Sequence, residues 1–327
     1  MKRRDLLKLG LAASATALAA PKAFSQAAYP SRPIKLVVPF SAGGVNDIVG
    51  RQWAEKVKAA LGTVYVENVP GAGGTLGVME VGRADPDGHS ILFGSASTMV
   101  LNEMTRKTLP YDPRKDFVPI AIFCVSTTSI AVNAALPVKN VKELVAYVKA
   151  NAGKLSYGSA GTGTMSHLSG ELFKQITGLK DLVHVPYKGA GPGIADLISG
   201  HIPIMSPNVS NQTLNLHSTG KIRILAVNAA GRLKGAPDLP TAIEQGVPNM
   251  IGQLFLGIYA RAGTPPAAVA KIADATKQAM ADAAFEAVLI KSGFEPMNHY
   301  GPEAGLKYMA EEYARWKPVV DAIGLKV

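Results

Sequence analysis

Two short loops of small and polar residues contain the groups best suited to hold a small anion. The first loop covers residues 40–47 and the second covers residues 158–167, and each follows an apolar run that predicts a buried strand. Each loop also precedes a helical pattern, so its backbone N–H groups are unpaired and lie at the positive end of a helix dipole. Because the loops lie far apart in the chain, we expect two lobes that face one anionic ligand.

Both loops also have a purely structural interpretation. Asn46 or Asp47 could cap a helix that follows the first loop, and Thr164 or Ser166 could cap one that follows the second. Asp47 fits capping better than ligand binding, since a carboxylate repels an anion. A lone histidine such as His167 is more often a structural hydrogen-bonding group than a catalyst. From the residues alone, both interpretations stay open.

Four further positions could reach the same ligand. Ala72 lies in a glycine-rich turn, where the backbone can approach a ligand closely. Tyr187 could supply a hydroxyl, and Ser95 and Asn208 follow predicted strands whose carboxyl ends could border a cleft, although a structural role is equally open for each. The complete set of candidate ligand-binding residues is Phe40, Ser41, Ala42, Gly43, Gly44, Asn46, Ala72, Ser95, Ser159, Ala160, Gly161, Thr162, Gly163, Thr164, Ser166, His167, Tyr187 and Asn208.

Sequence motifs for catalysis, cofactors and metals are missing. The chain has no Gly-x-Ser-x-Gly elbow, no P-loop and no complete Gly-x-Gly-x-x-Gly fingerprint. Its six histidines lack zinc-site spacing, and its single cysteine, Cys124, lies in an apolar run. We therefore expect no metal, no cofactor and no catalytic residue. The alternative to a binding protein is an exported enzyme that uses Ser166 together with His167.

Composition fits a globular two-domain protein. The chain has 327 residues, of which 47% are hydrophobic and 18% are charged, enough for two α/β domains. Its net charge of +10 suits an anionic solute, but no basic block is interleaved with aromatic residues, so we expect no nucleic-acid partner.

The N-terminus has the features of an export signal. A basic segment, Lys2-Arg3-Arg4, precedes the short apolar run 9–20, and small residues then mark cleavage near Ser25 or Ala27. Residues 1–25 are thus predicted to be a signal peptide, and the mature protein is expected in the periplasm. The paired arginines resemble a twin-arginine signal, and an ordinary secretory signal is the open alternative.

Strands and helices alternate along most of the chain, which predicts parallel, doubly wound sheets. We expect a crossing strand at 120–132, a return strand at 255–260 and a helical tail from Pro266. The remaining expected elements are strands 33–38, 64–68, 89–94, 155–158, 183–187, 202–206 and 222–227, and helices 47–61, 75–84, 141–150, 165–177, 192–199 and 211–218.

Many short motifs in a fixed order connect the chain to a known family. They include Val-Pro-Phe-Ser-Ala-Gly-Gly at 38–44 and Tyr-Gly-Ser-Ala-Gly-Thr-Gly at 157–163. The other matching segments are 29–34, 66–74, 85–88, 167–168, 171–173, 185–189, 220–223, 225–227, 240–241, 244–246 and 263–265. With these motifs the chain resembles the solute receptors of tripartite tricarboxylate transporters, often called the Bug family.

The resemblance implies an α/β, periplasmic-binding-protein-like fold of two doubly wound domains joined by a two-strand hinge. Domain 1 would comprise 26–125 and 251–327, and domain 2 would comprise 126–250. Such a receptor is expected to be a monomer that closes on a small carboxylate (a di- or tricarboxylate, an acidic amino acid or an aromatic acid) through the two loops. It would deliver this ligand to a membrane permease with a large and a small subunit, or, alternatively, signal as an exported sensor component.

This sequence departs from the family pattern at two places. The family often has Gly or Thr at position 45, Thr or Ala at position 46 and Asp at position 47. Here Val45 and Asn46 differ from that pattern, which could alter the far end of the pocket. Phe255 stands where the family often has tryptophan, and we expect this change to affect packing.

Overall fold

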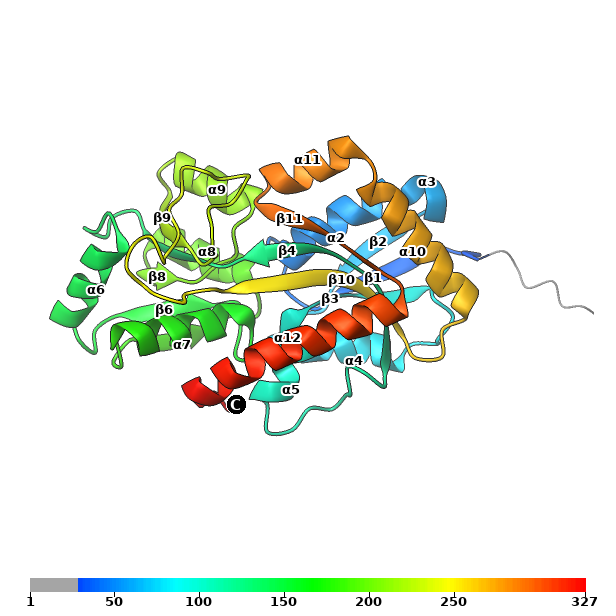
Figure 1. Cartoon of the computed structure of the whole chain (residues 1–327), viewed down its shortest axis with the longest axis horizontal. Helices are drawn as coiled ribbons and strands as arrows, with labels where there is room; N and C mark the ends of the chain where they lie inside the picture. Colours follow the sequence, from blue (N-terminus) through cyan, green and yellow to red (C-terminus); the bar gives the residue numbers. More distant parts are fainter. Residues whose placement is uncertain (1–28) are drawn as a thin grey trace, which may run out of the picture.

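The computed structural model describes residues 29–327, which form two mixed α/β lobes side by side (Figure 1). One lobe contains a six-stranded sheet with the strand order β11-β4-β10-β3-β1-β2, and we call it the large lobe. The other contains a five-stranded sheet with the order β7-β6-β8-β5-β9, and we call it the small lobe. The predicted signal peptide and both predicted cleavage positions lie outside the described residues.

The sheet of the large lobe is parallel in one half and antiparallel in the other. β1, β2 and β3 are parallel, whereas β10 runs antiparallel to both β3 and β4, and β11 runs antiparallel to β4. The expectation of a wholly parallel sheet was therefore wrong. The strand β10, which returns from the other lobe, pairs antiparallel with both β3 and β4. The strands are β1 (Ile34–Val38), β2 (Val64–Asn68), β3 (Ser90–Ser95), β4 (Phe117–Thr127), β10 (Gln253–Arg261) and β11 (Phe294–Tyr300).

Helices pack around the large sheet (Figure 1). The expected helical tail from Pro266 is interrupted by β11, so that prediction is wrong over 294–300. The helices are α2 (Val45–Lys56), α3 (Lys58–Leu61), α4 (Thr75–Arg83), α5 (Asn102–Thr105), α10 (Pro266–Met280), α11 (Ala283–Lys291) and α12 (Pro302–Ile323), with a 3₁₀ turn at Ala72–Gly74 and a π turn at Ser97–Leu101.

The small lobe is wound on both faces of its sheet. Ile130 and Val132 of β5 pack into one apolar cluster and Ala131 packs into another, as the period of two along a strand requires. The strands are β5 (Ser129–Asn133), β6 (Ser156–Ser159), β7 (Val183–Pro186), β8 (Ile204–Met205) and β9 (Ile222–Val227), and the helices are α6 (Val141–Ala150), α7 (Met165–Thr177), α8 (Ala190–Ser199) and α9 (Asn211–Ser218).

The chain crosses between the sheets twice, at adjacent points. The expected single crossing strand is two strands, β4 and β5, which are separated at Thr128. Thr128 N–H donates to Gly252 O and Asn228 N–H donates to Thr128 O, both at 2.8 Å, so the outgoing and returning chains are bonded to each other. Phe255, on the returning strand β10, is buried and packs edge-on against Tyr308 of α12, as expected for a packing role.

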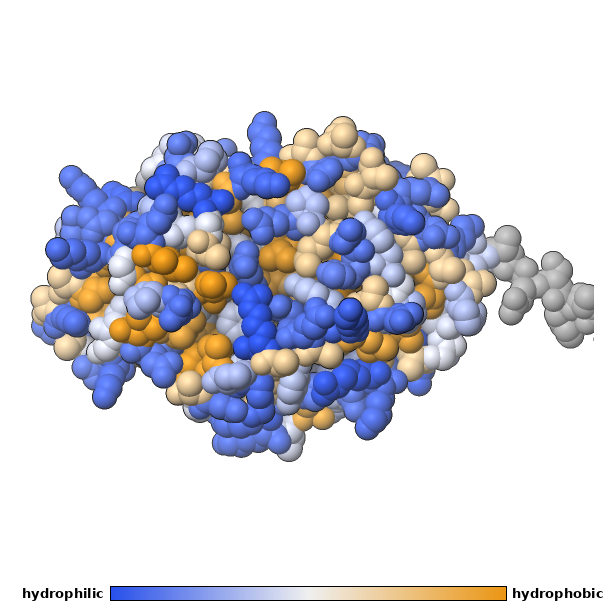
Figure 2. Space-filling model, in the orientation of Figure 1, coloured by the Kyte–Doolittle hydropathy of each residue, from blue (hydrophilic) through white to orange (hydrophobic). Residues whose placement is uncertain are grey.

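The large lobe has a dense aromatic and aliphatic core. Trp53, Phe93, Phe123 and Tyr259 are fully buried there, and Cys124 lies among them with no exposed surface. Figure 2 shows hydrophilic residues spread over both lobes between smaller apolar areas. No helix among residues 29–327 is long and apolar enough to cross a membrane.

Candidate ligand-binding site

A small pocket lies where the loops of the two lobes meet. It spans about 330 Å³ of space, a volume that includes space open to solvent. The large lobe lines it with Phe40, Gly44, Val45, Asn46, Ser97 and Leu254, and the small lobe lines it with Ala160, Thr164, Ser166, Ala190 and Asn208. None of these residues is charged. Any charge on a ligand here must therefore be stabilised by neutral donors.

Three helices begin at this pocket. Gly44 is the N-cap of α2, Thr164 is the N-cap of α7, and Ala190 is the first residue of α8. Each helix start carries a partial positive charge from its dipole, which favours an anion. The convergence of α2 from one lobe with α7 and α8 from the other gives the pocket a positive potential without a lysine or an arginine.

The first loop leaves its donors free. Helix α2 begins at Val45 and Gly44 caps it without a side-chain hydrogen bond, so neither Asn46 nor Asp47 is the N-cap as we had considered. Within the described residues, the N–H groups of Val45 and Asn46 have no protein acceptor. They are available to a ligand in the pocket.

Asp47 takes a structural role next to these free donors. Its carboxylate accepts hydrogen bonds from Gly43 N–H at 3.1 Å, Arg51 Nε at 2.9 Å and Asn68 Nδ2 at 3.0 Å. Burial alone would raise the pKa of Asp47, but these hydrogen bonds lower it below the ordinary value. The Asp47 carboxylate is thus hydrogen-bonded entirely within the large lobe. The Gly43 N–H donates to it and is not free for a ligand.

Two asparagine amides line the pocket from opposite lobes. Asn46, in the first turn of α2, is 5% exposed, and Asn208, just before α9, is 7% exposed. The Nδ2 atom of each is buried and has no hydrogen-bond partner in the part of the chain that the structure describes. Buried amides are normally hydrogen-bonded, so these two donors point to a ligand.

The second loop, in contrast, satisfies most of its own donors. Ala160 N–H donates to Ser166 Oγ at 3.2 Å, Gly161 N–H to Ser159 Oγ at 3.1 Å, and Gly163 N–H to His167 Nδ1 at 3.1 Å. The capping interpretation of Thr164 is confirmed, because its side chain accepts from the His167 N–H. These bonds hold the loop in one shape.

A stacked pair of histidines lies behind the second loop. The rings of His167 and His184 are 3.7 Å apart, and Ser159 Oγ lies 2.7 Å from His184 Nε2. Burial lowers the pKa of His167 to about 4; burial and the neighbouring His167 lower that of His184 to about 3. Both rings are therefore neutral at pH 7, and His167 Nδ1 can accept the Gly163 N–H.

The Ser166–His167 pair lacks the geometry of a nucleophile and its base. Ser166 Oγ donates to the Ser206 carbonyl, and His167 Nδ1 is used by Gly163. A catalytic serine needs a hydrogen bond to its base, and the structure shows none between these two side chains.

Direct contacts between the lobes flank the pocket. The backbone N–H of Ser41 donates to Lys188 O at 3.3 Å, and Met165 N–H donates to Ser97 Oγ at 3.1 Å. Gly191 lies so close to Ala42 that an added Cβ would stand 2.2 Å from the Ala42 carbonyl oxygen. The structure is therefore a closed arrangement of the two lobes.

Not all predicted residues line this pocket. Ser95 is fully buried and its N–H donates to Thr98 Oγ1, Ala72 O accepts from Arg106, and Tyr187 OH donates to Asp196 at 2.7 Å. The predicted residues that line it are Phe40, Gly44, Asn46, Ala160, Thr164, Ser166 and Asn208. Those that lie behind or beside it are Ser41, Ala42, Gly43, Ala72, Ser95, Ser159, Gly161, Thr162, Gly163, His167 and Tyr187.

Four lining residues are absent from the predicted set, and one of them, Val45, was noted only as a departure from the family pattern. Ser97 follows β3 by two residues, and its small polar side chain was a usable signal. Ala190 opens α8 after Gly189, which resembles the other two helix starts. Leu254 lies inside β10 and had no polar signal at all.

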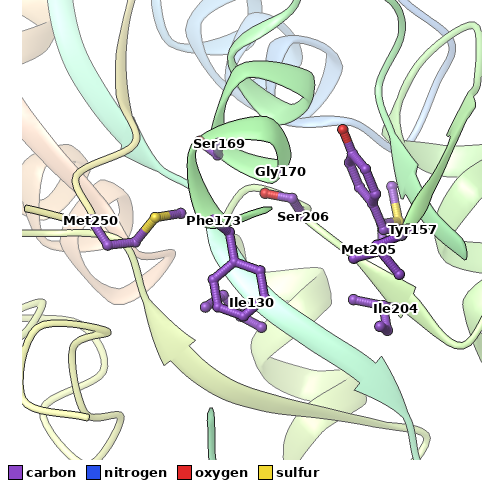
Figure 3. Close-up of a pocket in the computed structure, with 10 residues that line it drawn as sticks. Ile130, Tyr157, Ser169, Gly170, Phe173, Ile204, Met205, Ser206 and Met250 are labelled. Atoms are coloured by element: carbon purple, nitrogen blue, oxygen red, sulfur yellow. The ribbon is translucent and has the colours of Figure 1, made fainter. Parts of the chain in front are cut away.

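A second cavity lies inside the small lobe and is a packing feature. It spans about 290 Å³, a volume that includes space open to solvent, and is lined mainly by apolar side chains such as Ile130, Phe173 and Met205 (Figure 3). The hydroxyl group of Tyr157, which also lines this cavity, donates a hydrogen bond to Glu171. Among the described residues, no group of three or more histidine, cysteine, aspartate or glutamate side chains could hold a metal ion.

Two lobes, two adjacent crossings and a neutral, donor-rich pocket between them define the class of solute-binding proteins of the periplasmic type. Residues 49–325 match the model of the tripartite tricarboxylate transporter family receptor. The chain belongs to this family. A UPF0065 protein of Bordetella pertussis is 34% identical over 100% of this chain and 99% of its own length.

Solved structures agree in fold. The periplasmic binding protein BugD is 35% identical, with a TM-score of 0.87 over 91% of this chain and 100% of its own. The R. palustris protein Rpa4515 with adipate is 30% identical, with a TM-score of 0.87 over 91% and 100% of the two chains. MatC from Rhodopseudomonas palustris with bound malate is 30% identical, with a TM-score of 0.84 over 89% and 100%. Of these, BugD is described as a periplasmic binding protein.

Proposed function

We propose that this protein is a periplasmic receptor that captures a small carboxylate between its lobes and delivers it to a tripartite tricarboxylate-type transporter. The convergence of three helix N-termini on a pocket without charged side chains carries the proposal. A carboxylate fits such a site because its charge is stabilised by aimed N–H groups and helix dipoles.

The relatives support the same ligand class. Adipate and malate, named with two of the related structures, are both small dicarboxylates. The site residues proposed to contact the ligand are those that line the pocket, with the N–H groups of Val45 and Asn46 as the main free backbone donors.

The remaining parts of the proposal concern how the receptor works in the cell. Residues 1–25 direct export and are removed near Ser25 or Ala27. Domain 1 (26–125 and 251–327) and domain 2 (126–250) move about the bonded crossings at Thr128 and Gly252. The closed monomer docks on a permease with a large and a small subunit and catalyses no reaction, and the absence of a Ser166–His167 hydrogen bond supports this last point.

A thermal-shift panel tests the proposal. The purified protein is unfolded and refolded to remove carried ligand, then heated with dicarboxylates, citrate, acidic amino acids and aromatic acids. A ligand at 100 times its Kd adds about 2.7 kcal/mol of stability, which raises the melting temperature visibly. A rise with one class of carboxylate, recovered chemically unchanged, is expected. No rise with any carboxylate would contradict the proposal.

A further inference from the structure

The lobes also meet at a second seam, which lies outside the ligand pocket. There the 3₁₀ turn Ala72–Gly74 of the large lobe faces residues 161–163 of the small lobe. An added Cβ on Gly73 would stand 2.5 Å from the Thr162 carbonyl oxygen, and one on Gly161 would stand 3.6 Å from the Gly73 Cα. The two backbones therefore touch almost directly, and this contact exists only while the lobes are closed.

Arg106 connects the two sides of this seam. It follows α5, and its Nη2 donates to Ala72 O in its own lobe and to Thr162 O of the small lobe, the latter at 3.5 Å. The nearby Arg114 pairs with Glu103, whereas Arg106 has no carboxylate partner in the part of the chain that the structure describes. A partly buried cation needs polar groups in place of its water. For Arg106 these groups are carbonyls from both lobes.

The backbone that carries Arg106 is held firmly in the large lobe. Both neighbours of Arg106 form backbone hydrogen bonds with Val327, at 2.8 and 3.0 Å. Asn102, one helical turn earlier and fully buried, donates its side-chain amide to Gly73 O at 3.2 Å. The guanidinium and the turn beside it are thus fixed to one support, so a bond from Arg106 to the small lobe acts on the whole large lobe.

Both sides of the seam continue into the ligand pocket. Thr162 lies two residues before Thr164, which lines the pocket. The helical turns that lead to Arg106 begin at Ser97, which lines the pocket from the other lobe. Ser97 Oγ also accepts from Met165 N–H across the lobes at 3.1 Å. A bond at the seam therefore brings opposite walls of the pocket together without contacting the ligand.

We propose that Arg106 is a latch that stabilises the closed form of the protein by bonding the Thr162 carbonyl of the opposite lobe. It is a positioning residue, since it lies outside the pocket and bonds backbone groups. On opening, the Thr162 carbonyl moves away, whereas the bond to Ala72 stays within one lobe. Only such a difference between the two forms shifts their equilibrium. This inference rests on the proposed function, because it assumes that capture involves closure.

Amide hydrogen exchange, followed by NMR, tests the latch. The N–H groups of Ser41 and Met165 donate across the lobes, so they are protected while the lobes are closed. Wild type and Arg106→Met are compared after refolding without ligand, and again with adipate or malate. In the condition that protects the wild type most, both amides should exchange about tenfold faster in Arg106→Met, a factor typical of a hydrogen bond from a charged group.

An arginine that bonds within one lobe is the matched control. Arg223 donates three hydrogen bonds to carbonyls of residues 134–138, all in the small lobe. Arg223→Met should lower the melting temperature and leave the exchange of the two reporter amides unchanged. Arg106→Met should speed their exchange with a smaller loss of melting temperature. Arg106→Lys keeps a charged donor and should restore part of the protection.

The outcomes separate the latch from the function on which it rests. Equal exchange in wild type and Arg106→Met, or a change confined to residues 71–74 and 161–163, overturns the latch and leaves the carboxylate receptor intact. Fast exchange of both reporter amides in every wild-type sample also overturns it, because the lobes are then open in solution. If no carboxylate raises the melting temperature in the thermal-shift panel, the proposed function fails, and the exchange of the ligand-free proteins still decides the role of Arg106.

Discussion

The two glycine-rich loops look alike in the sequence, yet they differ in how they use their hydrogen bonds. In the loop before α2, Gly44 caps the helix without a side chain, and the Asn46 amide is left unpaired among the described residues. In the loop before α7, the N–H groups of Ala160, Gly161 and Gly163 are all bound by side chains of the same lobe. The first loop therefore offers free hydrogen-bond donors to a ligand. The second loop lines the pocket and is held in one shape by its own hydrogen bonds.

This difference shows that a helix N-terminus leaves backbone N–H donors free for a ligand only where its own sequence leaves it uncapped. Thr164 satisfies the α7 start from within, whereas Gly44 cannot do so for α2. The first loop also contacts the opposite lobe through Ser41, so ligand capture and lobe closure involve the same residues. Three predictions examine this division of roles, beginning with the largest effect.

Gly191→Ala should prevent closure onto the first loop. The added Cβ would stand 2.2 Å from the Ala42 carbonyl oxygen across the lobes, while within α8 alanine is favoured over glycine. Overpacking of this kind costs about 1–3 kcal/mol, so calorimetry should show carboxylate affinity falling about 10- to 100-fold. The melting temperature without ligand should not fall. Gly231→Ala, where an added Cβ meets nothing within 4 Å, is the control. Normal affinity in Gly191→Ala would show that closure does not bring these loops together.

His167→Asn should make the second loop less sensitive to acid. The unfolded histidine has a pKa of about 6.5, whereas His167 has about 4 and His184 about 3 when folded. The unfolded chain therefore binds more protons as pH falls from 6.5 towards 4, and acid favours unfolding. Asparagine keeps an acceptor for the Gly163 N–H but takes up no proton.

Melting curves between pH 7 and pH 4 measure this effect. The wild-type protein should lose more stability than His167→Asn, by at most about 1.4 kcal/mol per pH unit for the one proton removed. His201→Asn, at an exposed position, should follow the wild type. Parallel curves for all three proteins would mean that the stacked histidines do not hold the loop.

Tyr187→Phe should have the smallest effect. The Tyr187 hydroxyl donates to Asp196 at 2.7 Å and lies outside the pocket, so its loss should change carboxylate affinity less than twofold. A tenfold loss, measured by the same calorimetry, would place Tyr187 at the ligand and add it to the small-lobe residues that bind it.

The sequence was informative about local elements and about backbone donors. Helices 141–150, 165–177 and 211–218 were predicted with the bounds that the structure shows, because apolar spacing and polar caps agree there. Strand β11 was missed because Phe294–Tyr300 contains a proline and polar residues in an edge strand. The antiparallel half of the large sheet depends on pairing between distant segments, which no local pattern encodes.

The site was predictable only in part for a similar reason. The glycine-rich loops and Asn46 could be predicted as binding residues because their residue types are distinctive around a helix start. Leu254 could not be found, since an apolar residue in a buried strand looks like core. Whether a polar side chain reaches the pocket depends on its partners, and Tyr187 is occupied by Asp196.

The burial of Cys124 has a practical consequence for measuring movement of the lobes. It is the only cysteine in the sequence, it has no exposed surface, and burial raises the pKa of its thiol. Reagents that need a thiolate will therefore not label the native chain. Cysteines introduced at exposed Glu55 on α2 and Lys142 on α6 would carry a donor and an acceptor dye without background labelling. The molecule is already suited to watching single opening and closing events by energy transfer.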